Sequence, residues 1–371
     1  MLPYLLPFIL LCYGIIKYDI NNEKRGKISM WIGILLYFTL LIGLRYKVGG
    51  DTINYMGDYY WRVPLSQWKY SVLDKFQPGY TLLCALGKSI SPDFYVLQLL
   101  HSLILNCAIG IWIYKNTKYI FTSFMAFYLS SYLYFSTEIL REALAIMVFL
   151  FNYKNIEKKS WIKYYLGVII SCCFHLSAVI LFILPFLKKV QFNKTYILLM
   201  ICALIGSILS IRVIQSLSTI IVLAEKAEGY VGVTTGMMAG GYKLMITTIF
   251  PICFGYIATY KRTREIKFEW MIGIMGLLGI MALFNSIIFG RFSNYFILFF
   301  CVSFGTTIIQ WFKTQSQILR NNAFIFSLCF IILFGIGFKM YNKYTLWVPY
   351  YSIYNPTDIN REYADKMLLN R

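Results

Sequence analysis

The sequence predicts an all-α membrane protein that crosses the bilayer many times. Hydrophobic residues make up 59% of the 371 residues, charged residues make up only 14%, and the mean hydropathy is +0.63. This composition leaves too little polar surface to cover a water-soluble globule. A chain inside lipid must also satisfy its own backbone hydrogen bonds, which favours helices. We therefore expect a polytopic bundle of about 10–12 transmembrane helices.

Twelve apolar stretches support this prediction. They are residues 3–20, 28–44, 79–90, 94–114, 119–135, 139–153, 164–187, 196–221, 242–260, 270–289, 291–312 and 323–338. A spanning helix needs roughly 20 apolar residues, and most of these stretches approach that length. No ten-residue alternating pattern, which would indicate a transmembrane barrel, occurs in the sequence.

The orientation follows from six short basic loops, because such loops stay on the cytoplasmic side. These loops are residues 21–27, 115–118, 154–163, 188–194, 261–267 and 313–322. All six loops lie on the cytoplasmic side only if two of the apolar stretches do not cross the membrane. We predict that both of these stretches are re-entrant elements. Residues 79–90 are too short to cross, and residues 164–187 have basic flanks and a turn near CCFHLS. About ten helices then cross, and both termini face outward.

We expect one integral membrane domain over residues 1–338, with outer loops at residues 45–78 and 213–241. An aromatic-rich outer tail follows over residues 339–371. Tyrosine and tryptophan side chains in this tail suit stacking on sugar rings. They suit equally well an aromatic belt at the level of the lipid headgroups, and both interpretations stay open.

Three arginines fall at predicted outer helix ends, where positive charge is uncommon. They are Arg45, Arg141 and Arg291. A guanidinium donates two parallel hydrogen bonds to one phosphate and stays charged, so a lipid pyrophosphate is the expected ligand. The net charge of +19 has a second origin, since cytoplasmic lysines pair with anionic lipids. The basic residues form no continuous stripe, which argues against nucleic acid.

The first arginine lies in the segment GLRYKVGGDTINY, which also carries Lys47. Gly49 and Gly50 predict a turn, and Asp51 is a good N-cap for a following helix. Backbone N–H groups at such a helix start can bind an anion. Tyr55 shares a helix face with Asp51, because the two are four residues apart. The alternative is an arginine that extends to the headgroups from a helix end, followed by an ordinary turn.

The other two arginines also have neighbours at helical spacing. Glu138, Arg141 and Glu142 lie on one face of a helix, and we expect them to face the protein interior. The alternative is an internally neutralised pair with a structural role. Arg291 and Tyr295 likewise share a face, and the alternative there is an arginine that anchors in the headgroup zone.

The two histidines are the remaining candidates for proton transfer. His175 lies in the predicted turn SCCFHLSAV, where it suits a proton carrier or phosphate donor, or an ordinary hydrogen-bonded core residue. His101 lies among apolar residues, and we expect a structural role for it. The nine cysteines all fall in apolar stretches without metal-ligand spacing. No metal and no cofactor are therefore expected.

Five ordered segments resemble the EpsG family of bacterial exopolysaccharide proteins, which are Wzy-type polymerases. They are GLRYKVGGDTINY, FQPGYTLL, EILREALAI, CCFHLSAVILF and GRFSNYF. The resemblance covers the chain from about residue 40 to about residue 300. One departure is Gln77, which stands where the family pattern leads us to expect an acidic residue before Pro-Gly-Tyr.

The resemblance implies a multi-pass glycosyltransferase of the bacterial plasma (inner) membrane, acting on its outer face in O-antigen or exopolysaccharide synthesis. Such enzymes polymerise oligosaccharide repeat units carried on undecaprenyl diphosphate, with lipid-linked donor and acceptor and a chain-length regulator as partners. Preorganised arginines would stabilise the departing pyrophosphate without a metal. Asp51 or His175 would accept the proton of the attacking hydroxyl, and the sequence favours neither.

Three other functions remain open. A flippase for lipid-linked oligosaccharides would have charges deeper in a central cavity and two related halves, and no internal repeat occurs here. An O-antigen ligase would share the outer-face chemistry and differ in its acceptor. A membrane acyltransferase is weakened because His175 has no paired acid or nucleophile nearby in the sequence.

Overall fold

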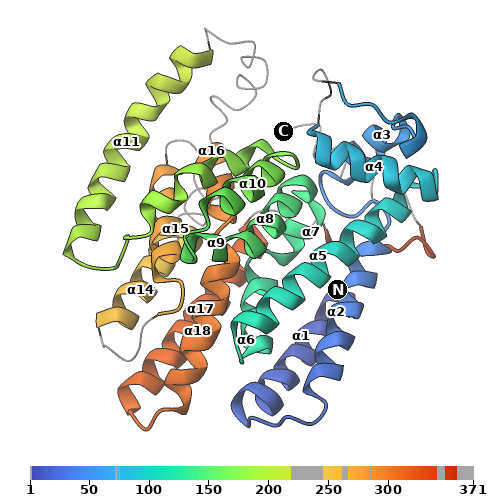
Figure 1. Ribbon diagram of the computed structural model, residues 1–371. Coiled ribbons are helices and arrows are strands. Elements are labelled where there is room, and N and C mark those ends of the chain that lie inside the picture. The colour runs from blue at the N-terminus through green and yellow to red at the C-terminus, as the bar shows by residue number, and fades with distance from the viewer. Residues whose placement is uncertain are drawn as a thin grey trace. The chain divides into compact units, whose positions relative to one another are not determined.

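The protein is helical throughout the part of the chain that the computed structural model describes. The described residues are 2–71, 74, 76–218, 245–260, 266–283, 286–340 and 347–356. Within them, β-structure is limited to two isolated bridges near Ser352, and Figure 1 shows a bundle of helices. The all-α prediction is confirmed. Residues 219–241 of the predicted outer loop and most of the predicted tail 339–371 lie outside the described residues.

The chain divides into two compact units, and each is described by itself. The first unit comprises residues 1–179 and 342–371, and the second comprises residues 180–341. The helices of the first unit are α1 (Leu2–Gly14), η1 (Ile15–Ile20), α2 (Lys27–Gly43), α3 (Thr52–Tyr60), η2 (Leu65–Gln67), α4 (Pro78–Ile90), α5 (Phe94–Asn116), α6 (Ile120–Phe127), η3 (Tyr128–Tyr132), α7 (Leu133–Thr137), α8 (Leu140–Asn152), α9 (Lys154–Glu157) and α10 (Trp161–Cys172).

Two long helices, α2 and α5, pack along each other in the first unit (Figure 1). Small residues allow this close approach, as is common between helices in membranes. A Cβ atom at Gly43 would overlap the side chain of Leu99, and one at Gly110 would overlap the side chain of Leu35. The ends of α2 and α5 are thereby fixed relative to each other, and the candidate site lies near them.

The helix lengths support a membrane protein. Residues Leu2–Ile20 and Phe94–Asn116 are long and apolar enough to span a membrane. The pair Ile288–Asn294 and Ile297–Lys313, bent by 48°, would be a third span if it counts as one. Seven apolar helices are shorter: Lys27–Gly43, Trp161–Cys172, Leu176–Leu187, Lys194–Ile208, Met245–Thr259, Glu269–Met281 and Gln317–Leu333. The class of protein is confirmed, and ten crossings stay a prediction.

Both predicted re-entrant segments have distinctive local structure. The α4 helix contains 13 residues, a length of about 20 Å, which is shorter than the bilayer core. The second segment is broken after Cys172, and a 3₁₀ helix, η4 (Leu176–Leu187), follows. The break coincides with the turn predicted at CCFHLS. The N–H of Gly79 donates to the Cys173 carbonyl at 2.7 Å, so the break lies against the start of α4.

The second unit is also built from helices over its described residues. They are α11 (Lys194–Ser218), η5 (Met245–Ile249), α14 (Phe250–Tyr260), α15 (Glu269–Met281), α16 (Ser286–Asn294), α17 (Ile297–Lys313) and α18 (Gln317–Met340). The Tyr196 hydroxyl donates to the Gly273 carbonyl at 2.7 Å. A Cβ atom at Gly276 would approach the same hydroxyl. This glycine face of α15 therefore allows α11 to pack closely.

Candidate functional site

Arg45 follows Leu44, the C-cap residue of α2, and is buried, with only 1% of its surface exposed. Its Nη1 donates to the Ile42 carbonyl at 2.6 Å, and its Nε donates to the Val48 carbonyl at 2.9 Å. A basic side chain that satisfies the last carbonyls of a helix is a stabilising cap. Burial lowers the pKa of Arg45 to about 10, so the cap is a cation at neutral pH. Two donors of this guanidinium are turned onto the backbone, and the phosphate contact expected from the sequence stays a prediction.

The glycine turn after Arg45 already holds an anion, the carboxylate of Glu138. The N–H of Gly50 donates to its Oε1 at 3.0 Å, and the N–H of Asp51 donates to its Oε2 at 3.2 Å. Gly49 has a φ of +105°, which favours glycine. Asp51 is the N-cap residue of α3, as predicted, but its exposed side chain makes no capping hydrogen bond. The turn that was predicted to bind an anion therefore exists, and the anion that it binds is the Glu138 side chain of the protein itself.

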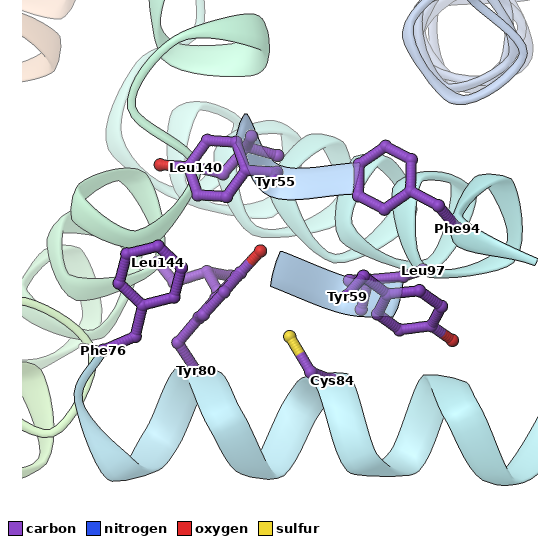
Figure 2. Packing of buried hydrophobic residues seen from close by; sticks show 9 residues of the cluster. All are labelled: Tyr55, Tyr59, Phe76, Tyr80, Cys84, Phe94, Leu97, Leu140 and Leu144. Atoms are coloured by element: carbon purple, nitrogen blue, oxygen red, sulfur yellow. The ribbon is translucent and has the colours of Figure 1, made fainter. Parts of the chain in front are cut away.

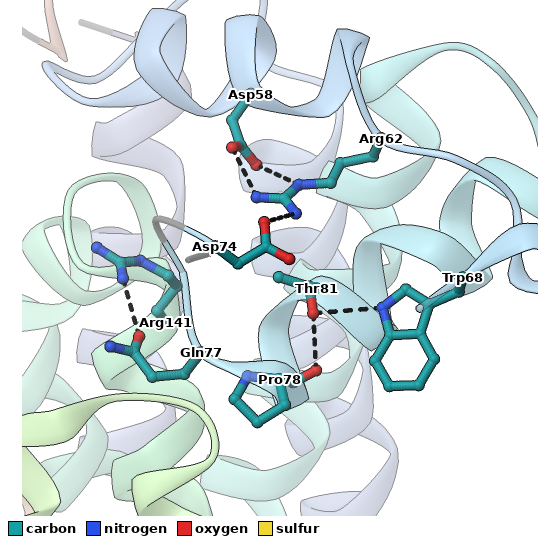
Figure 3. Close-up of polar contacts among 8 residues, drawn as sticks. All are labelled: Asp58, Arg62, Trp68, Asp74, Gln77, Pro78, Thr81 and Arg141. Carbon is teal, nitrogen blue, oxygen red and sulfur yellow. Dashed lines mark hydrogen bonds and ion pairs between the residues drawn. The ribbon is translucent and has the colours of Figure 1, made fainter. Parts of the chain in front are cut away.

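Arg141, at the start of α8, is a cation without a carboxylate partner in the described part of the chain. Its Nη1 donates to the Gln77 Oε1 atom at 3.0 Å (Figure 3), and its guanidinium lies 3.9 Å from the centre of the Phe76 ring. Its Nε is buried and has no hydrogen-bond partner among the described residues. A guanidinium held by a neutral amide and an aromatic face keeps its charge for an external anion.

Two residues near Arg141 differ in what they bind. Glu138 bonds the Gly50 turn, and no ion pair joins it to Arg141 among the described residues. Gln77, the departure from the family pattern, is the hydrogen-bond partner of Arg141. Because an amide carries no charge, Gln77 orients the guanidinium without neutralising it.

An aromatic cluster supports Arg141 from α3 and α4. Tyr55 and Tyr80 lie 5.7 Å apart between ring centres, and Phe76 lies 6.1 Å and 5.5 Å from them, respectively. Figure 2 shows these rings beside Leu140 and Leu144 of α8. Burial raises the pKa of Tyr55 to about 12, partly offset by the nearby charge and hydrogen bond of Arg141. Tyr55 therefore stays a neutral phenol next to the guanidinium.

An ion-paired cluster that sequence reasoning missed holds the loop above α4 (Figure 3). The Nε and Nη2 atoms of Arg62 donate to both carboxylate oxygens of Asp58 at 3.0 and 2.8 Å. Its Nη1 donates to Asp74 at 2.7 Å. Burial lowers the pKa of Arg62, but the hydrogen bonds that Arg62 donates to Asp58 and Asp74 outweigh this effect and raise the pKa. The four-residue spacing of Asp58 and Arg62 was the available signal.

Replacing Arg62 with leucine is expected to destabilise the protein by roughly 2 kcal/mol, because two partly buried carboxylates lose their charged donor. The measurement is thermal unfolding of the purified protein in detergent. Arg25→Leu is the matched control, because Arg25 is exposed in the loop before α2. Equal unfolding temperatures for the two variants would contradict a stabilising role for the Asp58–Arg62–Asp74 cluster.

His175 lies directly before η4 and is 9% exposed. The backbone N–H of Ser177 donates to its Nδ1 at 3.2 Å, and the Ser177 hydroxyl lies 2.7 Å from the same nitrogen. An Nδ1 that accepts from an N–H leaves the proton of neutral imidazole on Nε2. The Cys173–Gly79 backbone bond brings the turn that carries His175 against the start of α4, which Gln77 directly precedes.

The remaining predicted residues are Lys47, Arg291 and Tyr295, and their part in a site stays a prediction. Lys47 has a φ of +49°, and its Nζ lies over the Tyr46 ring at 5.2 Å. Arg291 is partly buried on α16, and Tyr295 is fully buried just after it. Both belong to the second unit. Among the residues that the structure describes, no three His, Cys, Asp or Glu side chains gather to hold a metal ion.

The chain folds into helices, and cationic and aromatic side chains cluster where α2 ends and α8 begins. These features define an all-α membrane protein. The chain belongs to the EpsG family, because the model of that family matches residues 27–352. EpsG proteins are polymerase-like membrane proteins associated with polysaccharide synthesis. Comparisons with curated proteins and with solved structures give no match. The family resemblance read from the five sequence segments is confirmed.

Proposed function

We propose that the protein is a Wzy-type glycosyltransferase. It polymerises oligosaccharide repeat units carried on undecaprenyl diphosphate at the outer face of the bacterial inner membrane. The product is an O-antigen or exopolysaccharide chain, and a chain-length regulator is a further partner. The observation that carries the proposal is Arg141, whose charge meets the neutral Gln77, the face of Phe76 and the phenol of Tyr55, and no carboxylate among the described residues. An unneutralised guanidinium beside a neutral phenol suits a phosphate-bearing substrate.

The chemistry needs charge stabilisation at the leaving group. A hydroxyl of the acceptor sugar attacks the anomeric carbon of the donor, and the bond from that carbon to the diphosphate oxygen breaks. The diphosphate leaves with the electron pair, and Arg141 stabilises its developing charge through preorganised donors. Arg291 is proposed for the second diphosphate, with Tyr295 beside it, and Lys47 adds positive charge near the turn.

The proton of the attacking hydroxyl needs a base. Asp51 is exposed at the start of α3, where solvent and substrate reach it. His175 is less exposed, and its Nδ1 is engaged by Ser177. Both residues stay candidates for this step. Arg45 is assigned to the support of this region, since its Nε and Nη1 atoms already bind backbone carbonyls of the following loop and of α2.

Deletion of the gene tests the function directly. A lost polymerase leaves the surface lipid with a single repeat unit on a polysaccharide gel, because repeat units are still made and exported. Re-expression of the intact chain restores the ladder of longer products. A deletion strain whose surface lipid carries no repeat unit at all would contradict polymerase activity and favour a flippase or ligase.

A further inference from the structure

The described end of the chain returns to the outer end of α2. We call residues 347–356 the C-terminal strap. The N–H of Tyr46 donates to the Tyr351 carbonyl at 2.8 Å, and the N–H of Ile353 donates to the Leu44 carbonyl at 2.9 Å. Arg45 and Ser352 form an antiparallel bridge between these bonds. The strap therefore forms part of the structure around Arg45.

Side chains of the strap are packed into the first unit. The Tyr350 hydroxyl donates to the Leu41 carbonyl at 2.9 Å, and the Tyr4 hydroxyl donates to the Trp347 carbonyl at 2.8 Å. Trp347 is 5% exposed, whereas Tyr354 is 81% exposed. Trp347 is therefore buried in the first unit, and both interpretations of the aromatic tail stay predictions.

A series of hydrogen bonds runs from Trp347 to the glycine turn. The indole Nε1 of Trp347 donates to the Thr137 Oγ1 atom at 3.0 Å. The Thr137 hydroxyl lies 3.0 Å from the Glu138 Oε1 atom and 2.8 Å from the Leu133 carbonyl, and it has one proton to donate. Glu138 then accepts from the N–H groups of Gly50 and Asp51. The donation from Trp347 occupies a lone pair of the hydroxyl and so restricts its rotation.

This series of hydrogen bonds ends at α3, the helix that contacts Arg141. The Glu138 carboxylate holds the first residues before α3, and Tyr55 lies one turn into α3. Arg141 lies close enough to Tyr55 for its charge to lower the pKa of the phenol. A shift of the turn between Gly49 and Asp51 would therefore move Tyr55 relative to the guanidinium. The strap reaches α3 through Thr137 and Glu138.

We propose that Trp347 is a positioning residue, whose indole N–H fixes Thr137 and Glu138 and so sets the position of the glycine turn and α3 beside Arg141. The role of this arrangement in polymerisation rests on the proposed function. The hydrogen-bond series itself does not, because it is defined by the contacts of the folded chain.

A double-mutant cycle tests the proposal. Trp347→Phe keeps an aromatic six-membered ring and removes the five-membered ring that carries the N–H donor. Thr137→Val keeps the shape and removes the hydroxyl. Each is expected to lower kcat for polymer formation about fivefold, the effect of one net hydrogen bond. The double variant is expected to be no worse than the poorer single variant, since both remove the same series. Thr137→Ser is expected to retain activity, and Tyr354→Phe is the matched control on the exposed part of the strap.

Amide hydrogen exchange gives a readout that does not depend on polymerisation. Peptides that contain Gly50 and Asp51 are expected to exchange faster in Trp347→Phe and in Thr137→Val, and at the wild-type rate in Thr137→Ser and Tyr354→Phe. Unchanged exchange in both Trp347→Phe and Thr137→Val, or additive losses in the cycle, would overturn the hydrogen-bond series. Faster exchange with undiminished kcat would overturn the positioning role. A deletion strain with normal polymer would instead refute the proposed function, while the exchange result would still stand.

Discussion

Replacing Arg141 with alanine is expected to lower polymer formation by about 100-fold, the usual cost of removing one preorganised donor from a developing anion. The guanidinium is placed by Gln77 and Phe76, and no carboxylate among the described residues neutralises it. Arg141→Lys is expected to fail as well, because an ammonium lacks the planar group that stacks on Phe76 and binds a phosphate with two parallel bonds. The measurement is the amount and length of polymer made from a lipid-linked donor.

Arg320→Ala is the matched control for this prediction. Arg320 lies on α18, is exposed, and also donates to a glutamine side chain, that of Gln317. Its replacement removes the same charge and the same kind of hydrogen bond from a surface position, so polymer formation is expected to stay at the wild-type level. Normal polymer from an Arg141→Ala protein that reaches the membrane in normal amounts would remove Arg141 from the site.

Replacing Gly49 with alanine is expected to disrupt the turn that Glu138 binds. The φ of +105° is strained for alanine. The added Cβ would also lie 2.8 Å from the Thr137 Cβ and 2.9 Å from the Thr52 hydroxyl. We expect a loss of about 1–3 kcal/mol of stability, together with a large loss of polymer because α3 shifts. Thermal unfolding in detergent measures the first effect, and the polymer assay measures the second.

Gly57→Ala provides the comparison within the same segment. Gly57 lies inside α3, and nothing lies within 4 Å of an added Cβ atom. Alanine in a helix interior is favoured over glycine by up to about 1 kcal/mol. Gly57→Ala is therefore expected to leave stability unchanged or slightly raised. Similar unfolding temperatures for Gly49→Ala and Gly57→Ala would show that the left-handed turn is not required.

Some residues of the site could be predicted from the sequence, and others could not. Sequence reasoning selected Arg141 from its position at a helix end, Gly49 and Gly50 from turn chemistry, and the break at CCFHLS from basic flanks. It did not foresee that two donors of Arg45 bind backbone carbonyls, because an arginine at a helix end can bind either a ligand or the carbonyls of its own helix. It missed the Asp58–Arg62–Asp74 cluster, although Asp58 and Arg62 are only four residues apart. It also missed the contact of Gln77 with Arg141 and that of Trp347 with Thr137, because these partners lie far apart along the chain.

The sequence by itself determined that this protein is a helical membrane protein of the EpsG family, with a helix break at residues 173–175. Those properties depend on apolar composition, local turn chemistry and short ordered segments, which act over a few residues at a time. Tertiary structure alone decided that Glu138 binds the glycine turn, that Gln77 orients Arg141 without neutralising it, and that Trp347 donates to Thr137. Each of those choices pairs groups from separate segments, and only the packing of the helices brings such groups within hydrogen-bonding distance.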